Sequence, residues 1–333
     1  MLKNILKKKE FTIFLMIIIF SLIVTVLNSN FLKIGNFVDI AKGNVVYGIM
    51  AFGMLVVLIS GGIDLSVPAN ITLSSVICGE LLVKTGLSLF PIILVCIVVS
   101  GLVGLINGIL ITKAKLPPFV ATLGVNSIIM GLVLYYTRGS MITGLPEWFR
   151  DFGVMRLLQV GDFNIPIQVV FYIVAAFITY FVLRHTVFGR GVYAVGGNPL
   201  NAARVGYNVD QITILIYVFS GFMMGLAAVV NTSVLQGVNP NTYAGVDMTV
   251  ISIAVIGGAS TLGGVGSVLG TVLGTLLMGV LQNGLIMAKI SSFWQEIIMG
   301  IVILVAVSAD IISRKREQAK LVHVDVDESE EVL

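Results

Sequence analysis

Apolar runs of about 18 residues or more recur along the whole of this 333-residue chain. A helix of that length can cross the ~30 Å hydrocarbon core of a bilayer. Charged residues make up only 11% of the chain, against roughly 25% in a soluble domain, so no soluble domain of useful size remains between the runs. The sequence therefore predicts an all-α membrane protein with about ten transmembrane helices, at residues 11–28, 44–60, 68–85, 89–111, 118–137, 164–183, 211–230, 247–259, 264–287 and 293–312.

The distribution of basic residues predicts how these helices are oriented. If the N-terminus is cytoplasmic and every segment crosses, thirteen Lys and Arg residues lie inside and seven outside, in the sense of the positive-inside rule. Both termini are then cytoplasmic. We divide the chain into a basic N-terminus (1–10), a membrane domain (11–312) and an acidic tail (313–333). The first apolar run is not followed by a small-residue cleavage site, so we expect it to stay as a helix.

The stretch SGGIDLSVPAN, at 60–70, places an aspartate between two of the most apolar runs of the chain. A charge at mid-bilayer depth is costly. Asp64 is tolerated there if it caps the next helix by accepting hydrogen bonds from its free N–H groups, while Gly61 and Gly62 allow the chain to turn. The alternative is that Gly61, Gly62, Asp64 and Ser66 form a polar lining of a transport pathway, or a hinge.

Two pairs of short stretches indicate an internal repeat. GIDLSV (62–67) resembles GVDMTV (245–250), and NGILITKAKLPPF (107–119) resembles NGLIMAKISSF (283–293). In the predicted topology the first member of each pair faces inside and the second faces outside. The first five and the last five helices are therefore expected to form an inverted repeat. Repeats of this kind build transporters, with the path at the repeat interface.

The eighth segment is short, because GGASTLGG at 257–264 interrupts it. Short or glycine-broken helices point to a transport pathway, so Asp247, Gly257 and Gly258 are candidates for a pathway or a hinge. Asp247 is open to the same capping interpretation as Asp64. Four polar residues are further candidates to line the path: Asn126, Ser127, Asn231 and Thr232.

Several small residues in the apolar runs predict close packing rather than ligand binding. Glycines at four-residue spacing lie on one face of a helix and let a neighbouring backbone approach. This spacing occurs at Gly221 and Gly225 and within a helix expected over 264–279, at Gly266, Gly270 and Gly274. Cys78 and Cys96 lie inside apolar runs and are interpreted as small core residues.

The polar stretch 184–210 contains a compact helix signal. Asn198 is a good N-cap, Pro199 a good first residue and Gly206 a good stop, which predicts a helix of about two turns outside the bilayer. It is either a surface connector or a docking element for a cytosolic partner. In the second case Ala202 and Ala203 would offer a small apolar face, and Arg204 could pair with an acid of the partner.

The motifs of common catalytic sites are absent from the sequence. The glycine-rich stretch 257–270 has no lysine and cannot cradle phosphates as a P-loop does, and no HExxH, CxxC or GxSxG occurs. His185 and His323 are isolated, and the spans hold too few charges for a proton or sodium relay. We therefore expect a non-catalytic chain without metal, cofactor or nucleic-acid partner, which takes its energy from elsewhere.

Several motifs, in order and at similar spacing, resemble the membrane permease subunits of bacterial sugar ABC importers, such as the ribose, xylose, galactose and autoinducer-2 systems. The resemblance covers roughly residues 40–310. The motifs that carry it are SGGIDLSV (60–67), KLPPFVATLG (115–124), YAVGGNPLNAARVG (193–206), VIGGASTLGGVGSVLGTVLG (255–274), NGL (283–285) and SSFWQEIIMGIVILVAV (291–307).

The resemblance implies the activity and the partners. Two permease chains, identical or sister chains, would form the pore in the bacterial cytoplasmic membrane. Two ATPase domains would bind beneath it, and an extracytoplasmic binding protein would deliver a monosaccharide. The family's coupling segment maps onto Gly197, Asn198, Ala202, Ala203 and Gly206, and its GGIDLS motif onto 61–66. One departure is Pro68, where glycine is common in the family.

Other functions remain open on the sequence. Permeases for nucleosides or branched-chain amino acids are distant relatives of this family. A stand-alone secondary transporter would need an ion-coupling residue inside a span, and the sequence offers almost none besides Asp64. A membrane-embedded enzyme is disfavoured by the missing catalytic motifs.

Overall fold

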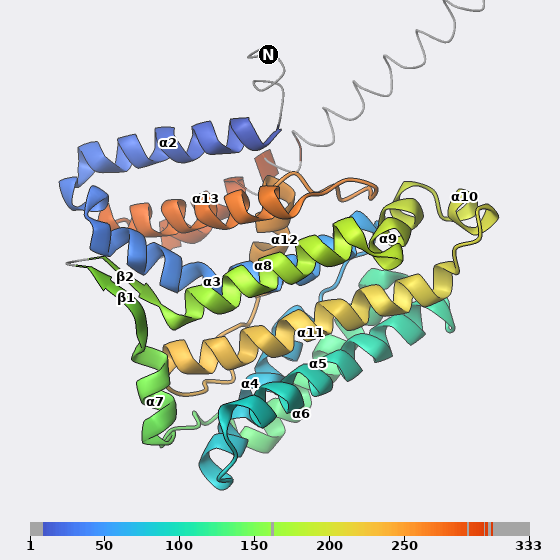
Figure 1. Cartoon of the computed structure of the whole chain (residues 1–333), viewed down its shortest axis with the longest axis horizontal. Helices are drawn as coiled ribbons and strands as arrows, with labels where there is room; N and C mark the ends of the chain where they lie inside the picture. Colours follow the sequence, from blue (N-terminus) through green and yellow to red (C-terminus); the bar gives the residue numbers. More distant parts are fainter. Residues whose placement is uncertain (1–8, 161–162, 292, 303, 306–307, 309–333) are drawn as a thin grey trace, which may run out of the picture.

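The computed structural model describes residues 9–160, 163–291, 293–302, 304–305 and 308, and within these it is almost entirely helical (Figure 1). Among the described residues, eight helices are long and apolar enough to cross a membrane: α2 (Lys9–Leu27), α3 (Ile34–Ile59), α4 (Val67–Lys84), α5 (Leu89–Thr112), α6 (Pro118–Thr137), α8 (Ile167–His185), α11 (Val209–Leu235) and α13 (Val268–Met287). Two shorter apolar helices are α12 (Val246–Ile256) and Phe293–Val302. The prediction of an all-α membrane protein is confirmed.

The remaining elements lie at the two ends of this bundle (Figure 1). One end, called here the α10 end, carries the short helices α9 (Val187–Gly197) and α10 (Pro199–Arg204). The opposite end, called the α7 end, carries α7 and a small antiparallel hairpin in which Arg156 pairs with Pro166. Its elements are η1 (Ser29–Leu32), α7 (Glu147–Val154), β1 (Arg156–Val160) and β2 (Phe163–Pro166).

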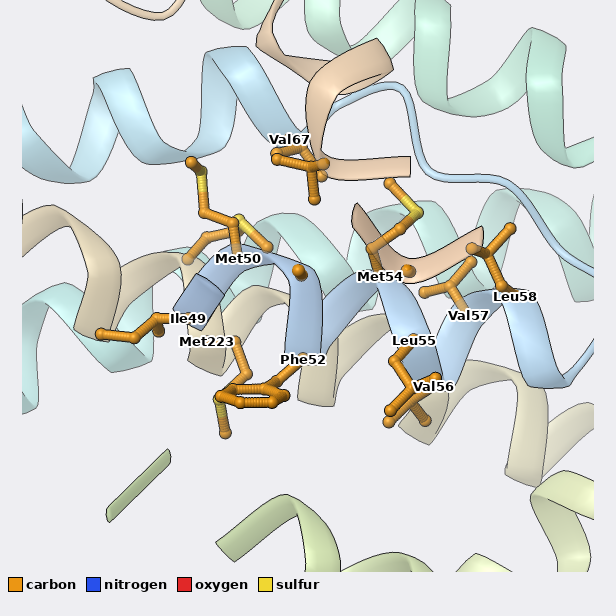
Figure 2. Packing of buried hydrophobic residues seen from close by; sticks show 14 of the residues in the cluster. Ile49, Met50, Phe52, Met54, Leu55, Val56, Val57, Leu58, Val67 and Met223 are labelled. Carbon is orange, nitrogen blue, oxygen red and sulfur yellow. The ribbon is translucent and has the colours of Figure 1, made fainter. Parts of the chain in front are cut away.

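Helix α3 forms the centre of the bundle. Its second half, 48–59, is apolar and buried on every side, which is the pattern of a helix surrounded by other helices. Figure 2 shows part of this cluster, in which Phe52 of α3 lies close to Met223 of α11. The outer helices instead expose apolar side chains, as is expected where a helix faces lipid, and Val26 of α2 is 87% exposed.

The contacts between helices in the first half have equivalents in the second half, as a repeat requires. Helix α5 packs on α11 as α13 packs on α3, and α4 contacts α11 as α12 contacts α3. Helices α4 and α5 contact each other, as do α12 and α13. Each of α3, α4 and α5 therefore corresponds to α11, α12 and α13 in turn. This correspondence matches the sequence pairs noted above and favours the predicted inverted repeat.

Glycines mark the closest of these helix contacts. A Cβ on Gly225 of α11 would lie 2.5 Å from Cys96 O of α5, and one on Gly257 would lie 2.6 Å from Gly270 O of α13. The packing role predicted for Gly221, Gly225, Gly270 and Gly274 is thus confirmed. A side-chain atom rather than a backbone atom, Ile59 Cγ1 of α3, lies 2.7 Å from a Cβ added to Gly266. That residue precedes α13, which begins at Val268 and not at 264, because Gly263 and Gly264 adopt left-handed φ angles of 89° and 76°.

Both cysteines lie where the sequence predicted. Cys78 of α4 and Cys96 of α5 are free and fully buried in one apolar cluster. They pack as small core side chains between the two helices.

Candidate functional site

Three glycine-rich segments meet at the α10 end, and we call their meeting point the glycine junction (Ile59, Gly61, Gly196, Gly263 and Gly264). The Gly264 N–H, from the loop after α12, donates a hydrogen bond of 2.8 Å to Ile59 O at the end of α3. A Cβ on Gly263 would lie 2.6 Å from Gly196 O and 3.0 Å from Gly61 N. The end of α9 is therefore in backbone contact with the breaks of both repeat halves.

The junction leads directly into α10 through Asn198. The Asn198 N–H donates to Ala194 O of α9 at 3.1 Å, and Asn198 Oδ1 accepts from the Asn201 N–H at 3.0 Å. Asn198 thus ends one helix and caps the next, as the sequence predicts for α10. Gly206 follows with φ 92°, a conformation that favours glycine and ends the segment. The sequence did not predict α9 itself.

The apolar surface of α10 differs from the predicted one. Ala202 is only 3% exposed and faces its own chain, where Ala202 O accepts the Tyr207 N–H, while Ala203 and Arg204 are exposed. The large apolar side chains that project outward are Leu200 and Val205, each 74% exposed. The sequence analysis missed these two, although an exposed leucine in a polar loop is a usable signal.

Asp64 is buried, 2% exposed, in the break between α3 and α4, where it accepts several hydrogen bonds. Its Oδ1 accepts from the Ser66 N–H at 3.0 Å and from Ser66 Oγ at 2.6 Å, and its Oδ2 accepts from Ser220 Oγ of α11 at 3.0 Å. Asn107 of α5 donates to Ser66 Oγ at 2.7 Å. The segment between α3 and α4 is therefore linked by hydrogen bonds to α11 through the Asp64 carboxylate and to α5 through Ser66.

The prediction that Asp64 caps α4 is wrong. Its backbone donor is Ser66, which precedes α4, and the N–H groups around the start of α4 are satisfied by α6 instead. The Leu65 N–H donates to Thr122 Oγ1 at 3.0 Å, and the Ala69 N–H donates to Asn126 Oδ1 at 3.1 Å. Asn126, predicted as a pathway residue, therefore caps a neighbouring helix, which no local sequence signal could have shown.

The other residues predicted for the pathway are scattered. Ser127 is exposed on α6, whereas Thr232 and Asn231 of α11 are buried. Asn231 Oδ1 accepts from Tyr243 Oη at 2.7 Å, so this side chain joins a helix to a loop. Asp247 is half-buried in the first turn of α12 and has no side-chain cap bond there.

The candidate hinge residues fall into two places. Gly61 packs near Leu262 of the loop after α12, the loop that Gly257 and Gly258 begin, and Gly258 has φ 91°. Asp247 lies at the opposite end of α12, about 15 Å away along the helix. The structure thus brings Gly61 of the first half to the loop that Gly257 and Gly258 begin in the second half, whereas Asp247 lies at the far end of α12.

Sequence comparison assigns the family. Residues 36–307 match the family described as "Branched-chain amino acid transport system / permease component". The chain belongs to this permease family. The permease is 38% identical to the ribose import permease of Bacillus subtilis and 34% identical to that of Haemophilus influenzae; each alignment covers 89% of this chain and 91% of the relative.

A third relative is named for a different sugar. The permease is 30% identical to the D-allose transport system permease of Escherichia coli, over 90% of each chain. No solved structure gives a significant match. The motifs predicted for coupling and for the pathway, 60–67, 193–206 and 255–274, all lie within the matched residues.

Proposed function

We propose that this permease is the membrane subunit of an ATP-driven importer, and that it carries a ribose-like monosaccharide across the bacterial cytoplasmic membrane into the cell. The observation that carries the substrate class is the 38% identity to a ribose import permease over nearly the whole chain. Other relatives are named for allose and for galactose and methyl galactoside, so the class is a sugar rather than one sugar.

In this proposal the energy enters at the α10 end. The permease itself is non-catalytic and holds no cofactor, and ATPase subunits bind α10 on the cytoplasmic side. Leu200 and Val205 project from α10 and supply apolar contacts, while Arg204 supplies a charge for an acidic partner residue. Gly197 and Ala203, both exposed beside them, complete the docking surface.

The glycine junction would carry the movement of α10 to both halves. Gly196 touches Ile59 of the first half and Gly264 of the second through backbone atoms, so no flexible side chain lies between them to absorb a displacement. A shift of α9 and α10 therefore tilts α3 and the loop before α13 together. Opposite tilting of two inverted halves is how alternating access arises in repeat transporters.

A second permease chain, identical or sister, would complete the path. Helix α6 leaves one face uncovered, where a Cβ on Gly124 or Gly131 would meet nothing within 4 Å and Ser127 is exposed. Small residues in a membrane helix allow another helix to approach closely. The sugar would pass between the two chains, delivered by a binding protein at the α7 end.

The proposal is tested with the complex purified from its host and reconstituted in vesicles. We expect labelled ribose uptake that requires the loaded binding protein and ATP and is blocked by vanadate. Leu200→Glu should abolish uptake and release the ATPase, whereas Leu87→Glu, at an exposed position between α4 and α5 and away from α10, should leave the ATPase bound. Leucine uptake in place of sugar would favour the branched-chain amino acid alternative, which the family description supports. Uptake by the permease alone in an ion gradient would overturn both.

The orientation has its own test. Leu200→Cys should react with a membrane-impermeant maleimide only in inverted vesicles, and Trp148→Cys of α7 only in intact cells. The opposite pattern would contradict docking of a cytosolic ATPase at α10.

A further inference from the structure

A basic groove lies at the α10 end, on the side of the bundle away from α6. It is bounded by the end of α8, by α9 and by the start of α13, and its volume is about 880 Å³. Its residues are Tyr180, Leu183, Arg184, Arg190, Tyr193, Gly266, Ser267, Val268 and Leu269. Two arginines and two tyrosines thus line one wall, and apolar residues of α13 line the other.

The charge of this groove is positive. Arg184 lies in the last turn of α8 and Arg190 in α9, and neither forms a salt bridge within the part of the chain that the structure describes. An acid that the structure describes near the groove is Glu10 of α2, whose Oε1 accepts a hydrogen bond of 3.3 Å from Ser267 Oγ. Glu10 is not part of the groove lining, and two guanidinium groups outnumber it. Guanidinium groups are suited to phosphate oxygens, which they bind in pairs of parallel hydrogen bonds.

An apolar groove of about 240 Å³ continues along the same two helices. From the basic groove, α8 runs back from Tyr180 to Ile173 while α13 runs forward from Leu269 to Leu276 (Figure 1). Seven residues of helix cover about 10 Å in this direction. The floor is α3, and the residues lining the apolar groove are Ile40, Ala41, Asn44, Val45, Val169, Tyr172, Ile173, Val272, Thr275 and Leu276.

We propose that the two grooves together bind an anionic phospholipid, with its phosphate between Arg184 and Arg190 and one acyl chain along the α8–α13 groove. The charge is at the end of two membrane-spanning helices, which is where lipid headgroups lie, and Tyr180 and Tyr193 are residues of that interface. A soluble anion would use the arginines but would leave the apolar groove empty. A lipid fills both, because its charge and its hydrocarbon chain are joined in the same order as the two grooves.

The role of the two arginines in binding the phosphate is tested by native mass spectrometry of the purified complex with dioleoyl phosphatidylglycerol. Each arginine near an anionic headgroup contributes to binding, so we expect Arg184→Gln/Arg190→Gln to weaken retention about 30-fold. Arg184→Lys/Arg190→Lys should retain most of the affinity. The control Arg138→Gln, at the C-cap of α6, should bind as the wild type does. Equal binding by the double Gln variant and the wild type would overturn the proposal.

Substitutions in the apolar groove test whether the ligand is a lipid rather than a small anion. Leu276→Trp should fill it and reduce phosphatidylglycerol retention at least tenfold with both arginines intact, whereas Ile178→Trp, on α8 but outside the groove lining, should not. Soluble glycerol phosphate at millimolar concentration should fail to displace the lipid. Displacement by glycerol phosphate, or no effect of Leu276→Trp, would make this a small-anion site and overturn the lipid assignment. Dioleoyl phosphatidylcholine, which has no net charge, should bind more weakly; equal binding would remove the role of the arginines.

Discussion

Substitution of Gly196 by alanine tests the glycine junction directly. An added Cβ would overlap Ile59 O and lie 2.8 Å from Gly264 N, whereas real Cβ contacts stay beyond 3.0 Å. Neither neighbour is a side chain that can rotate away, because both are backbone atoms. Overpacking of this kind costs about 1–3 kcal/mol. The 2.8 Å hydrogen bond from Gly264 to Ile59 would also be strained or lost, at a net cost of about 1 kcal/mol.

A cost of about 2–4 kcal/mol at the junction shifts an equilibrium by roughly 30-fold to 900-fold. We therefore expect Gly196→Ala to lower ATP-driven uptake at least about tenfold while the complex still assembles and hydrolyses ATP. The matched control is Gly43→Ala in α3, where an added Cβ would meet nothing within 4 Å. That variant should transport normally.

The assay compares sugar uptake and ATP hydrolysis in the same vesicles, with assembly checked by gel filtration. Uptake by assembled Gly196→Ala within twofold of the wild type would refute the role of the junction. If Gly196→Ala does not assemble, Tyr193→Phe gives a milder test, because it removes only the 2.8 Å hydrogen bond from Tyr193 Oη to Gly266 O. Unchanged coupling in Tyr193→Phe would then count against a joint movement of α9 and the loop before α13.

Three further predictions concern the break before α4 and the two ends of α10. Asp64→Leu leaves the donors of Ser66 and Ser220 unpaired in a buried site, so it should lower the free energy of unfolding by about 3 kcal/mol, and Asp64→Asn by less. Melting temperatures in detergent measure this, and a Leu variant as stable as the wild type would disprove it. Asn198→Ala removes the α10 cap, worth about 1 kcal/mol, and should reduce uptake without reducing membrane insertion, while Asn198→Asp restores the cap. Arg204→Gln should uncouple ATP hydrolysis from uptake; normal uptake in both Asn198→Ala and Arg204→Gln would contradict docking at α10.

The features that the sequence predicted correctly are those with a local cause. A membrane helix can be predicted from the hydropathy of its own residues. In the part of the chain that the structure describes, eight long spans and two shorter apolar helices match the ten predicted segments in number and order. The start of α10 was also predictable, because Asn198 caps a helix that begins at the next residue. The repeat that two pairs of short similar stretches predict agrees with the pattern of helix contacts.

The features that sequence analysis missed depend on how the elements pack against one another. Asn126 is 57 residues from the N–H group that it caps, so the hydrogen bonds at the start of α4 could not be assigned from nearby residues. The burial of Ala202 and the exposure of Leu200 depend on how α10 lies against its own chain.

The sequence by itself determined that this chain is a bundle of membrane helices, because each helix must satisfy its own backbone hydrogen bonds within the bilayer. Only the tertiary structure decided that the ends of α3 and α9 and the loop before α13 touch through their backbones. A glycine in the sequence indicates that another backbone can approach closely. The packing of the whole bundle decides which backbone does so.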